Sequence, residues 1–117
     1  MGTALPNDNT RDELRRVNNM ISVLRALDSD MPITQASCFL WVALNEGRTQ
    51  VELRRALDLP SSTSSRSLAA LSKVHRLGKP GLDLIEWVEN PEDRRAKLLY
   101  LSIKGRQTIE KLLDTLR

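Results

Sequence analysis

Hydrophobic residues recur along the first part of the chain with the period of a helix. After Thr10 they form one stripe, at spacings of three and four: Leu14, Val17, Ile21, Leu24 and Leu27. Thr10 and Glu13 have the spacing of a capping box, which predicts a helix that starts near Arg11 and continues to about residue 29. The preceding residues show no such period, so we expect a flexible arm over residues 1–9.

A second helix is predicted from Thr34, which can cap it, to about Glu46. It carries a group of apolar side chains: Phe39, Leu40, Trp41, Val42 and Leu44. Gly47 follows, and glycine commonly ends a helix because it adopts a left-handed backbone without strain. Cys38 lies in the same apolar segment, so we expect it to be a small buried side chain.

Two short helices then follow, joined across a tight turn. Thr49 and Glu52 have the spacing of another capping box, and Pro60 ends the helix that they open because its ring removes a hydrogen-bond donor. The next helix is predicted over residues 61–74, with its first or second serine as the cap. Residues 49–77 therefore have the outline of a helix-turn-helix.

After a loop over residues 75–81 that contains glycine and proline, the pattern becomes strand-like. Residues 82–88 and 96–102 are short and rich in apolar and aromatic side chains, which predicts a hairpin over residues 82–101. Ser102 can cap a last helix, whose apolar residues again form one stripe: Ile109, Leu112, Leu113 and Leu116.

This order of elements is that of a winged helix domain with one extra helix at each end. A chain of 117 residues suffices for one domain, which we place at residues 10–117. The predicted fold class is mainly α with a small β-hairpin wing (α+β), a winged helix-turn-helix. Its flanking helices, 10–29 and 103–117, each carry a lone apolar stripe, which packs either on its own domain or across a two-fold axis in a dimer.

The distribution of charge is more informative about partners than the total charge. Lys and Arg number 18 against 15 Asp and Glu, which gives a mild net charge of +3. Between Leu59 and Leu82 there is no acidic residue, but several basic ones occur there: Arg66, Lys73, His75, Arg76 and Lys79. Such a stretch predicts a surface that faces phosphate groups.

The composition disfavours several other classes of function. One cysteine and one histidine cannot form an internal disulfide or a Cys/His zinc site, and no catalytic triad or phosphate-binding glycine loop is recognisable. We therefore expect neither an enzyme nor a cofactor. The sequence has no run of about 18 apolar residues and no signal peptide, which predicts a cytoplasmic protein that does not enter membranes.

Two stretches of the chain carry a more specific pattern. One is "ENPEDRRAKLLYL", residues 89–101, in which a proline, an aspartate and two arginines precede a strand, with Lys104 and Gly105 soon after. The other is "TQVELRRALDLPSSTSSRSLAAL", residues 49–71. Both are similar to the core of the MarR family of bacterial transcription regulators, and the resemblance spans residues 33–106.

The resemblance implies a sequence-specific, double-stranded DNA-binding regulator, a homodimeric repressor on a palindromic operator that is associated with the nucleoid. Together with the charge pattern and the hydroxyl-rich helix start, it indicates DNA contacts at the start of the second helix of the helix-turn-helix, at the basic residues that follow it and in the wing. The residues are Ser61, Ser62, Thr63, Ser64, Ser65, Arg66, Lys73, Arg76, Lys79, Arg94 and Arg95. It assigns dimer contacts to Leu14, Val17, Ile21, Leu24, Ile109, Leu112, Leu113 and Leu116.

In this family the wing arginine enters the minor groove, and alignment gives that role to Arg95, with Asp93 holding it in position. The alternative is a surface ion pair that only strengthens the hairpin. The serines of the recognition helix also have a simpler interpretation as caps. Ser64 stands where the family usually has valine or leucine, so it either opens this turn or adds a polar contact.

The residues leave other questions open. The loop 75–81 is longer than the family's usual connection, and it either adds DNA contacts or is an inert extension. A small-molecule effector is possible, but the short terminal helices do not favour the pocket that it would occupy. The wing also carries several acidic residues, Asp83, Glu86, Glu89, Glu92 and Asp93, so the alternative function is a winged helix that docks a partner protein without specific DNA binding.

Overall fold

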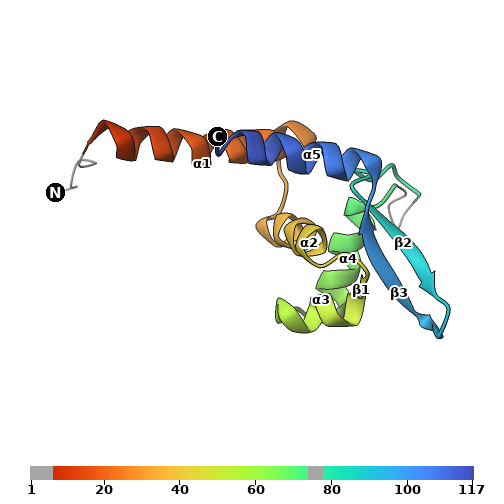
Figure 1. The fold of residues 1–117 in the computed structure, drawn as a ribbon. Helices are drawn as coiled ribbons and strands as arrows, with labels where there is room; N and C mark the ends of the chain where they lie inside the picture. Colours follow the sequence, from red (N-terminus) through yellow and green to blue (C-terminus); the bar gives the residue numbers. More distant parts are fainter. Residues whose placement is uncertain (1–6, 74–77) are drawn as a thin grey trace.

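The computed structural model describes residues 7–73 and 78–117, without the side chain of Arg94. In chain order the elements are α1 (Asp8–Leu27), α2 (Ile33–Leu44), β1 (Arg48–Thr49), α3 (Gln50–Ala56), α4 (Ser61–Leu71), β2 (Ile85–Asn90), β3 (Asp93–Leu101) and α5 (Ile103–Asp114). Helices α2, α3 and α4 pack beside the small antiparallel sheet, and α1 and α5 lie together at the other end of the molecule (Figure 1). This confirms the predicted α+β winged helix with flanking helices.

Helix α1 begins three residues earlier than predicted. Its N-cap is Asn7, whose Oδ1 accepts a hydrogen bond from the backbone N–H of Thr10 at 2.9 Å. The predicted capping box of Thr10 and Glu13 is therefore wrong, because an upstream asparagine already caps the helix. Residues 7–9 belong to the cap and first turn rather than to a flexible arm. The rest of the predicted arm, 1–6, lies outside the described residues.

Helix α2 also differs from the prediction at both ends. The residue before its first turn is Pro32, so Thr34 lies inside the helix and does not cap it. The helix ends at Leu44, and the chain turns at Gly47, which has a φ of +88°. A side chain there would be strained, which is the physical reason for glycine at this turn.

The helix-turn-helix has the predicted order. The capping box of α3 is confirmed: Thr49 Oγ1 accepts from the N–H of Glu52 at 3.2 Å, and Glu52 Oε1 accepts from the N–H of Thr49 at 3.3 Å. A serine cap for α4 was wrong, because Pro60 is the N-cap and no side chain caps the helix. Helix α4 ends at Leu71, three residues before the predicted end.

The sheet contains a strand that the sequence pattern did not reveal. Strand β1 is only two residues long, pairs with Leu98 and Leu99, and gives the strand order β1-β3-β2. So short a segment has no measurable period, and pairing alone defines it as a strand. The hairpin turns at Pro91 and Glu92, so both strands reach into the stretch that was predicted to connect them.

The hydrophobic core lies between α2, α4 and the sheet. Its fully buried side chains include Phe39 of α2, Leu68 of α4 and Leu99 of β3. Cys38 is buried there as predicted. Burial raises the pKa of its thiol, and a hydrogen bond with Ser67 opposes that rise, so the thiol is protonated at neutral pH.

Glu46 links segments that are far apart in the sequence. Its Oε1 accepts a hydrogen bond from the backbone N–H of Leu101 at 2.8 Å and another from Nη2 of Arg106 at 2.8 Å. The side chain of Glu46 is only 27% exposed. The contact therefore ties the loop after α2 to the end of β3 and the start of α5.

We expect Glu46→Ala to lower the free energy of unfolding by about 1–3 kcal/mol, because it leaves the N–H of Leu101 and the guanidinium of Arg106 without their acceptor. Urea denaturation followed by circular dichroism measures this change. Glu110→Ala removes an exposed carboxylate from α5 and should change the stability by less than about 0.5 kcal/mol. Equal effects of the two substitutions would contradict a structural role for Glu46.

Part of the predicted dimer set packs within its own domain. Leu24 of α1 and Leu112 of α5 are only 8% and 4% exposed and belong to the core, and Ile109 is half-buried against it. The prediction that Leu24 and Leu112 contact a partner is therefore wrong. The apolar stripe in the sequence includes both buried and exposed positions. Its buried residues pack α1 and α5 onto the domain.

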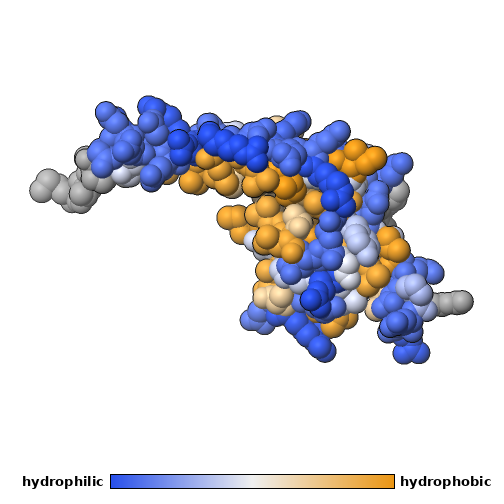
Figure 2. Space-filling view, viewed as in Figure 1, coloured by the Kyte–Doolittle hydropathy of each residue, from blue (hydrophilic) through white to orange (hydrophobic). Residues whose placement is uncertain are grey.

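The other members of that set are exposed and form what we call the terminal apolar set: Leu14, Val17, Ile21, Leu113 and Leu116, each 40–52% exposed. Helices α1 and α5 run side by side in opposite directions, and the N-terminal half of α1 projects past the end of α5 (Figure 1). Figure 2 shows hydrophobic colour on the side of α1 and α5 that faces α2. Exposed apolar residues gathered on a projecting helix mark an interaction surface.

Candidate DNA-binding surface

The first turn of α4 presents hydroxyl groups at a helix end that no side chain caps. The backbone N–H groups at this end have no partner within the helix, because an α-helix leaves its first donors unpaired. Ser61 and Ser62 are exposed, and Thr63 and Ser65 are half-buried. The turn contains no acidic residue. Free N–H groups, hydroxyls and the positive end of the helix dipole together suit phosphate oxygens.

Ser64 is a correction to the predicted contact set. Its side chain is 4% exposed, and its Oγ donates a hydrogen bond to the carbonyl oxygen of Ser61 at 3.0 Å. Ser67, Leu68 and Leu71 are buried as well, so position 64 belongs to the inward face of the helix. Its hydroxyl is satisfied inside the helix and does not reach a ligand in front of α4.

Arg66 lies one turn further along α4, on the side that faces the start of α2. Its Nε donates to the carbonyl oxygen of Ser62 at 3.5 Å, which is a long and weak contact. Arg66 and Thr63 line a hollow together with Thr34 and Gln35 of α2. None of the ion pairs in the described part of the chain involves Arg66, so its exposed guanidinium can turn toward an anionic ligand.

The tip of the wing, residues 90–95, is held by two hydrogen bonds between residues that are two apart in the sequence. Asn90 Oδ1 accepts from the backbone N–H of Glu92 at 3.0 Å, and Asp93 Oδ1 accepts from the backbone N–H of Arg95 at 3.0 Å. Side chains of Asn and Asp commonly stabilise turns in this way. The tip therefore holds its backbone in one shape and presents Arg95 as an exposed side chain.

The contact that Asp93 makes is not the predicted one. We expected its carboxylate to hold the Arg95 side chain, but it accepts from the Arg95 backbone instead, and the ion pairs found among the described side chains do not join the two. Asp93 thus positions the point where the Arg95 side chain leaves the strand. Arg94 belongs to β3, and its side chain lies outside the described residues.

Lys73 and Lys79, two more of the predicted basic residues, lie near the other end of α4, about 16 Å from the serine-rich turn for a helix of 11 residues. Lys73 and Lys79 are both exposed there, while Arg76 lies outside the described residues. The loop returns tightly to the helix, because Gly81 donates its N–H to the Lys73 carbonyl oxygen at 3.0 Å. A Cβ at Gly81 would lie 1.8 Å from the Ser72 carbonyl oxygen, so this part of the loop requires glycine. The structure does not bring Lys73 and Lys79 to the first turn of α4.

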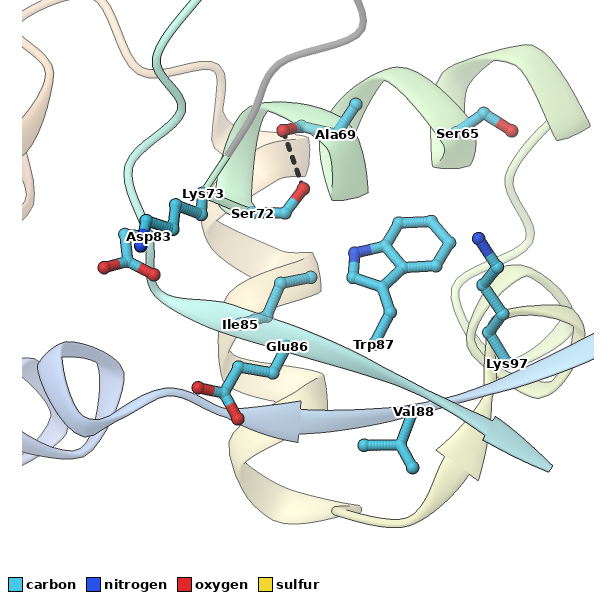
Figure 3. A pocket seen from close by; sticks show the side chains of 10 residues that line it. All are labelled: Ser65, Ala69, Ser72, Lys73, Asp83, Ile85, Glu86, Trp87, Val88 and Lys97. Carbon is cyan, nitrogen blue, oxygen red and sulfur yellow. Dashed lines mark hydrogen bonds between the residues drawn. The ribbon is translucent and has the colours of Figure 1, made fainter. Parts of the chain in front are cut away.

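A groove separates α4 from the wing (Figure 3). Ser65 lines it from α4, and Trp87 of β2 and Lys97 of β3 line it from the sheet. The indole ring points toward α4, and the Lys97 Nζ lies 5.0 Å from its centroid. No pattern in the sequence indicated Lys97 as a site residue. Only the strand register, in which Trp87 pairs with Leu99, shows that Lys97 is a diagonal neighbour of Trp87.

Two acidic residues, Asp83 and Glu86, are among those that line the groove, but their side chains do not point into it toward α4. Figure 3 shows that Glu86 points away from α4, on the opposite face of the hairpin from Trp87. Asp83 lies with Lys73 at one end of the groove, far from Ser65 (Figure 3). Both residues line the groove, but neither side chain points toward Ser65 in Figure 3.

Residues 7–73 and 78–117 contain neither a metal-binding cluster nor a membrane-spanning helix. No group of three His, Cys, Asp or Glu side chains there is placed to hold a metal ion. In the same residues, none of the helices has the length and apolar character that crossing a bilayer requires.

No family model and no curated protein matches the sequence. Solved structures do match. MarR is 23% identical, over 96% of this chain and 76% of that chain, with a TM-score of 0.65. The transcriptional repressor CouR bound to a 23-mer DNA duplex is 25% identical, over 97% of this chain and 72% of that chain, with a TM-score of 0.65. The MepR–DNA complex from S. aureus is 18% identical, over 92% of this chain and 78% of that chain, with a TM-score of 0.69.

These matches cover 92–97% of this chain. The matching proteins are transcription regulators and not enzymes, which agrees with the expectation that this chain is not an enzyme. The resemblance inferred from the wing and the helix-turn-helix is thus confirmed at the level of the fold. The chain has the winged helix fold of the MarR-family transcription regulators.

Proposed function

We propose that the protein is a sequence-specific regulator of transcription that binds double-stranded DNA. The observation that carries this proposal is the uncapped, hydroxyl-rich start of α4 with the exposed Arg66, next to a wing that projects from the same domain. A recognition helix reads base edges with its first residues, while helix N-termini and hydroxyls bind the phosphates. CouR and MepR, which have this fold, were solved with DNA bound.

The contact set that follows is smaller than the one predicted from the sequence. Ser61, Ser62, Thr63 and Ser65 contact DNA through the first turn of α4, and Arg66 contacts it from the second. Arg95 enters the minor groove, whose narrow A·T-rich stretches attract arginine. Asp93 supports it by holding the backbone, which lowers the entropy lost when the side chain binds.

The protein acts as a homodimer in this proposal. The terminal apolar set is exposed on α1 and α5, and a two-fold axis would bury it against the same residues of a second copy. Two copies of α4 would then enter successive major grooves about 34 Å apart, so the operator is an inverted repeat. Bound at a promoter in the cytoplasm, such a dimer represses by occlusion. A small-molecule effector is not needed for this mechanism.

The test is a selection from a pool of random DNA duplexes, followed by sequencing of the bound fraction. Fluorescence anisotropy then gives the affinity at about 50 and about 200 mM salt. We expect an enriched inverted repeat and an affinity that falls by about 10³-fold or more between the two conditions, because each phosphate contact releases counterions. Weak binding without an enriched motif would refute the proposal. It would favour instead a module that docks a basic partner protein on the acidic face of the wing, where Glu86 lies.

A further inference from the structure

The Lys97 side chain is exposed and lies over the ring of Trp87. It extends from β3, and its ammonium group lies 5.0 Å from the centre of the Trp87 ring and points toward the start of α4 (Figure 3). Glu89 is its register partner across the hairpin. The ion pairs formed within residues 7–73 and 78–117 do not include Lys97, so Glu89 does not form a direct ion pair with it.

The Trp87 ring limits where the Lys97 side chain can go. A cation over the face of an indole is attracted to it, and tryptophan is the strongest partner for this contact. A lysine side chain has four rotatable bonds and loses much entropy when it is immobilised. Since the ring already restricts Lys97, less of that entropy is lost when the ammonium group binds a ligand in the groove.

The groove lies between the two elements that are proposed to bind DNA. When α4 occupies the major groove and the wing tip reaches the adjacent minor groove, one sugar-phosphate strand must pass between them. Ser65 lies on the α4 side of that passage, and Trp87 and Lys97 lie on the wing side. A phosphate there meets a hydroxyl from one wall and an ammonium group from the other.

We propose that Lys97, held by the ring of Trp87, binds a DNA phosphate in the groove between α4 and the wing. The inference rests on the proposed function, since it concerns the same DNA. It adds a phosphate contact and a positioning residue, Trp87, that belong to neither the recognition helix nor the wing tip. The ammonium group supplies affinity that does not depend on base sequence, because it reaches the backbone only.

The experiment measures the salt dependence of binding to a fluorescein-labelled duplex that carries the selected inverted repeat. Lys97→Met removes the charge and keeps most of the side chain's length. We expect the slope of log K against log salt to decrease in magnitude by about 0.9 for each protomer bound, with an affinity several-fold lower at about 50 mM salt. Lys97→Arg keeps the charge and should restore the slope.

Lys104→Met is the matched control, because it removes the same charge from an exposed position at the start of α5. Its slope should equal that of the unaltered protein. If Lys97→Met has the slope of Lys104→Met while the unaltered protein binds the repeat, the inference is overturned and the proposed function stands. If the unaltered protein does not bind DNA, the proposed function itself fails.

The role of Trp87 is tested in a second cycle. Trp87→Leu should lower the affinity, and it should add nothing further in a protein that already carries Lys97→Met, because both changes act through one ammonium group. Additive losses would show that Trp87 does not act through Lys97. Thermal unfolding followed by circular dichroism shows whether Trp87→Leu is folded. If it is not, the salt slope of Lys97→Met alone tests the inference.

Discussion

Replacing Arg66 with alanine should lower the affinity for the selected operator by about 30-fold or more and leave the fold unchanged. One arginine contact with a base or phosphate contributes about 1–3 kcal/mol, and a symmetric dimer contains the contact twice, so the expected loss is about 2–6 kcal/mol. Arg66 is exposed and makes only a weak contact with its own helix, so its removal should not destabilise the domain. Anisotropy titrations measure the loss.

Arg25→Ala is the matched control, because it removes the same charge from an exposed position in the last turn of α1. It should bind the operator as the unaltered protein does, apart from a small change that follows from net charge. An Arg66→Ala protein that binds as tightly as Arg25→Ala would remove α4 from the DNA interface. The comparison therefore tests the central element of the proposed function.

Replacing Val17 with aspartate should convert the dimer into a monomer. Val17 is 51% exposed in the chain itself, so the substitution leaves the core intact. In a two-fold interface each residue counts twice, and about half of each Val17 side chain is left to be buried, so the lost apolar burial costs about 1.5–3 kcal/mol before the burial of two unpaired charges is added. We expect sedimentation velocity to show a monomer, and operator affinity to fall by about 10²-fold or more.

Asn19→Asp introduces the same carboxylate two residues away, on an exposed position of α1 that the apolar stripe does not include. It should remain dimeric and bind DNA normally. A Val17→Asp protein that sediments as the same species as Asn19→Asp would show that the terminal apolar set is not the dimer interface. The Arg66 and Val17 variants thus separate DNA recognition from dimerisation. Only Val17→Asp is expected to change the oligomeric state, whereas Arg66→Ala should remain a dimer.

Local signals predicted the five helices of the described residues and the hairpin, and they failed at helix boundaries where several residues could act as the cap. Thr49 with Glu52 and the cap at Ser102 were right because each side chain satisfies the free N–H groups of its own first turn. Thr10 has the same signature, but Asn7 caps the helix first. A capping pattern predicts that a helix end is near, and the competing cap decides the residue at which the helix begins.

The candidate site shows a similar division. The absence of acidic residues around α4 and the arginines of the wing pointed to a phosphate-binding surface, and both segments belong to the winged helix. Ser64 is buried because the helical period places it on the same face of α4 as Leu68 and Leu71. The sequence does not reveal this face, because the residues around Ser64 are all polar. Lys97 could not be found by spacing along the chain, because its partner is ten residues away on another strand.

By itself the sequence determined the order and type of every element except β1, the basic character of the region around α4 and the resemblance to MarR proteins, because these depend on hydrophobic periods, caps and turns that act within a few residues. Only the tertiary structure decided which side chains of different elements contact one another. It paired β1 with β3, joined Glu46 to Arg106, turned Leu24 and Leu112 inward, and placed Lys97 beside Trp87. Each of these contacts depends on how two distant segments pack together, which no local pattern records.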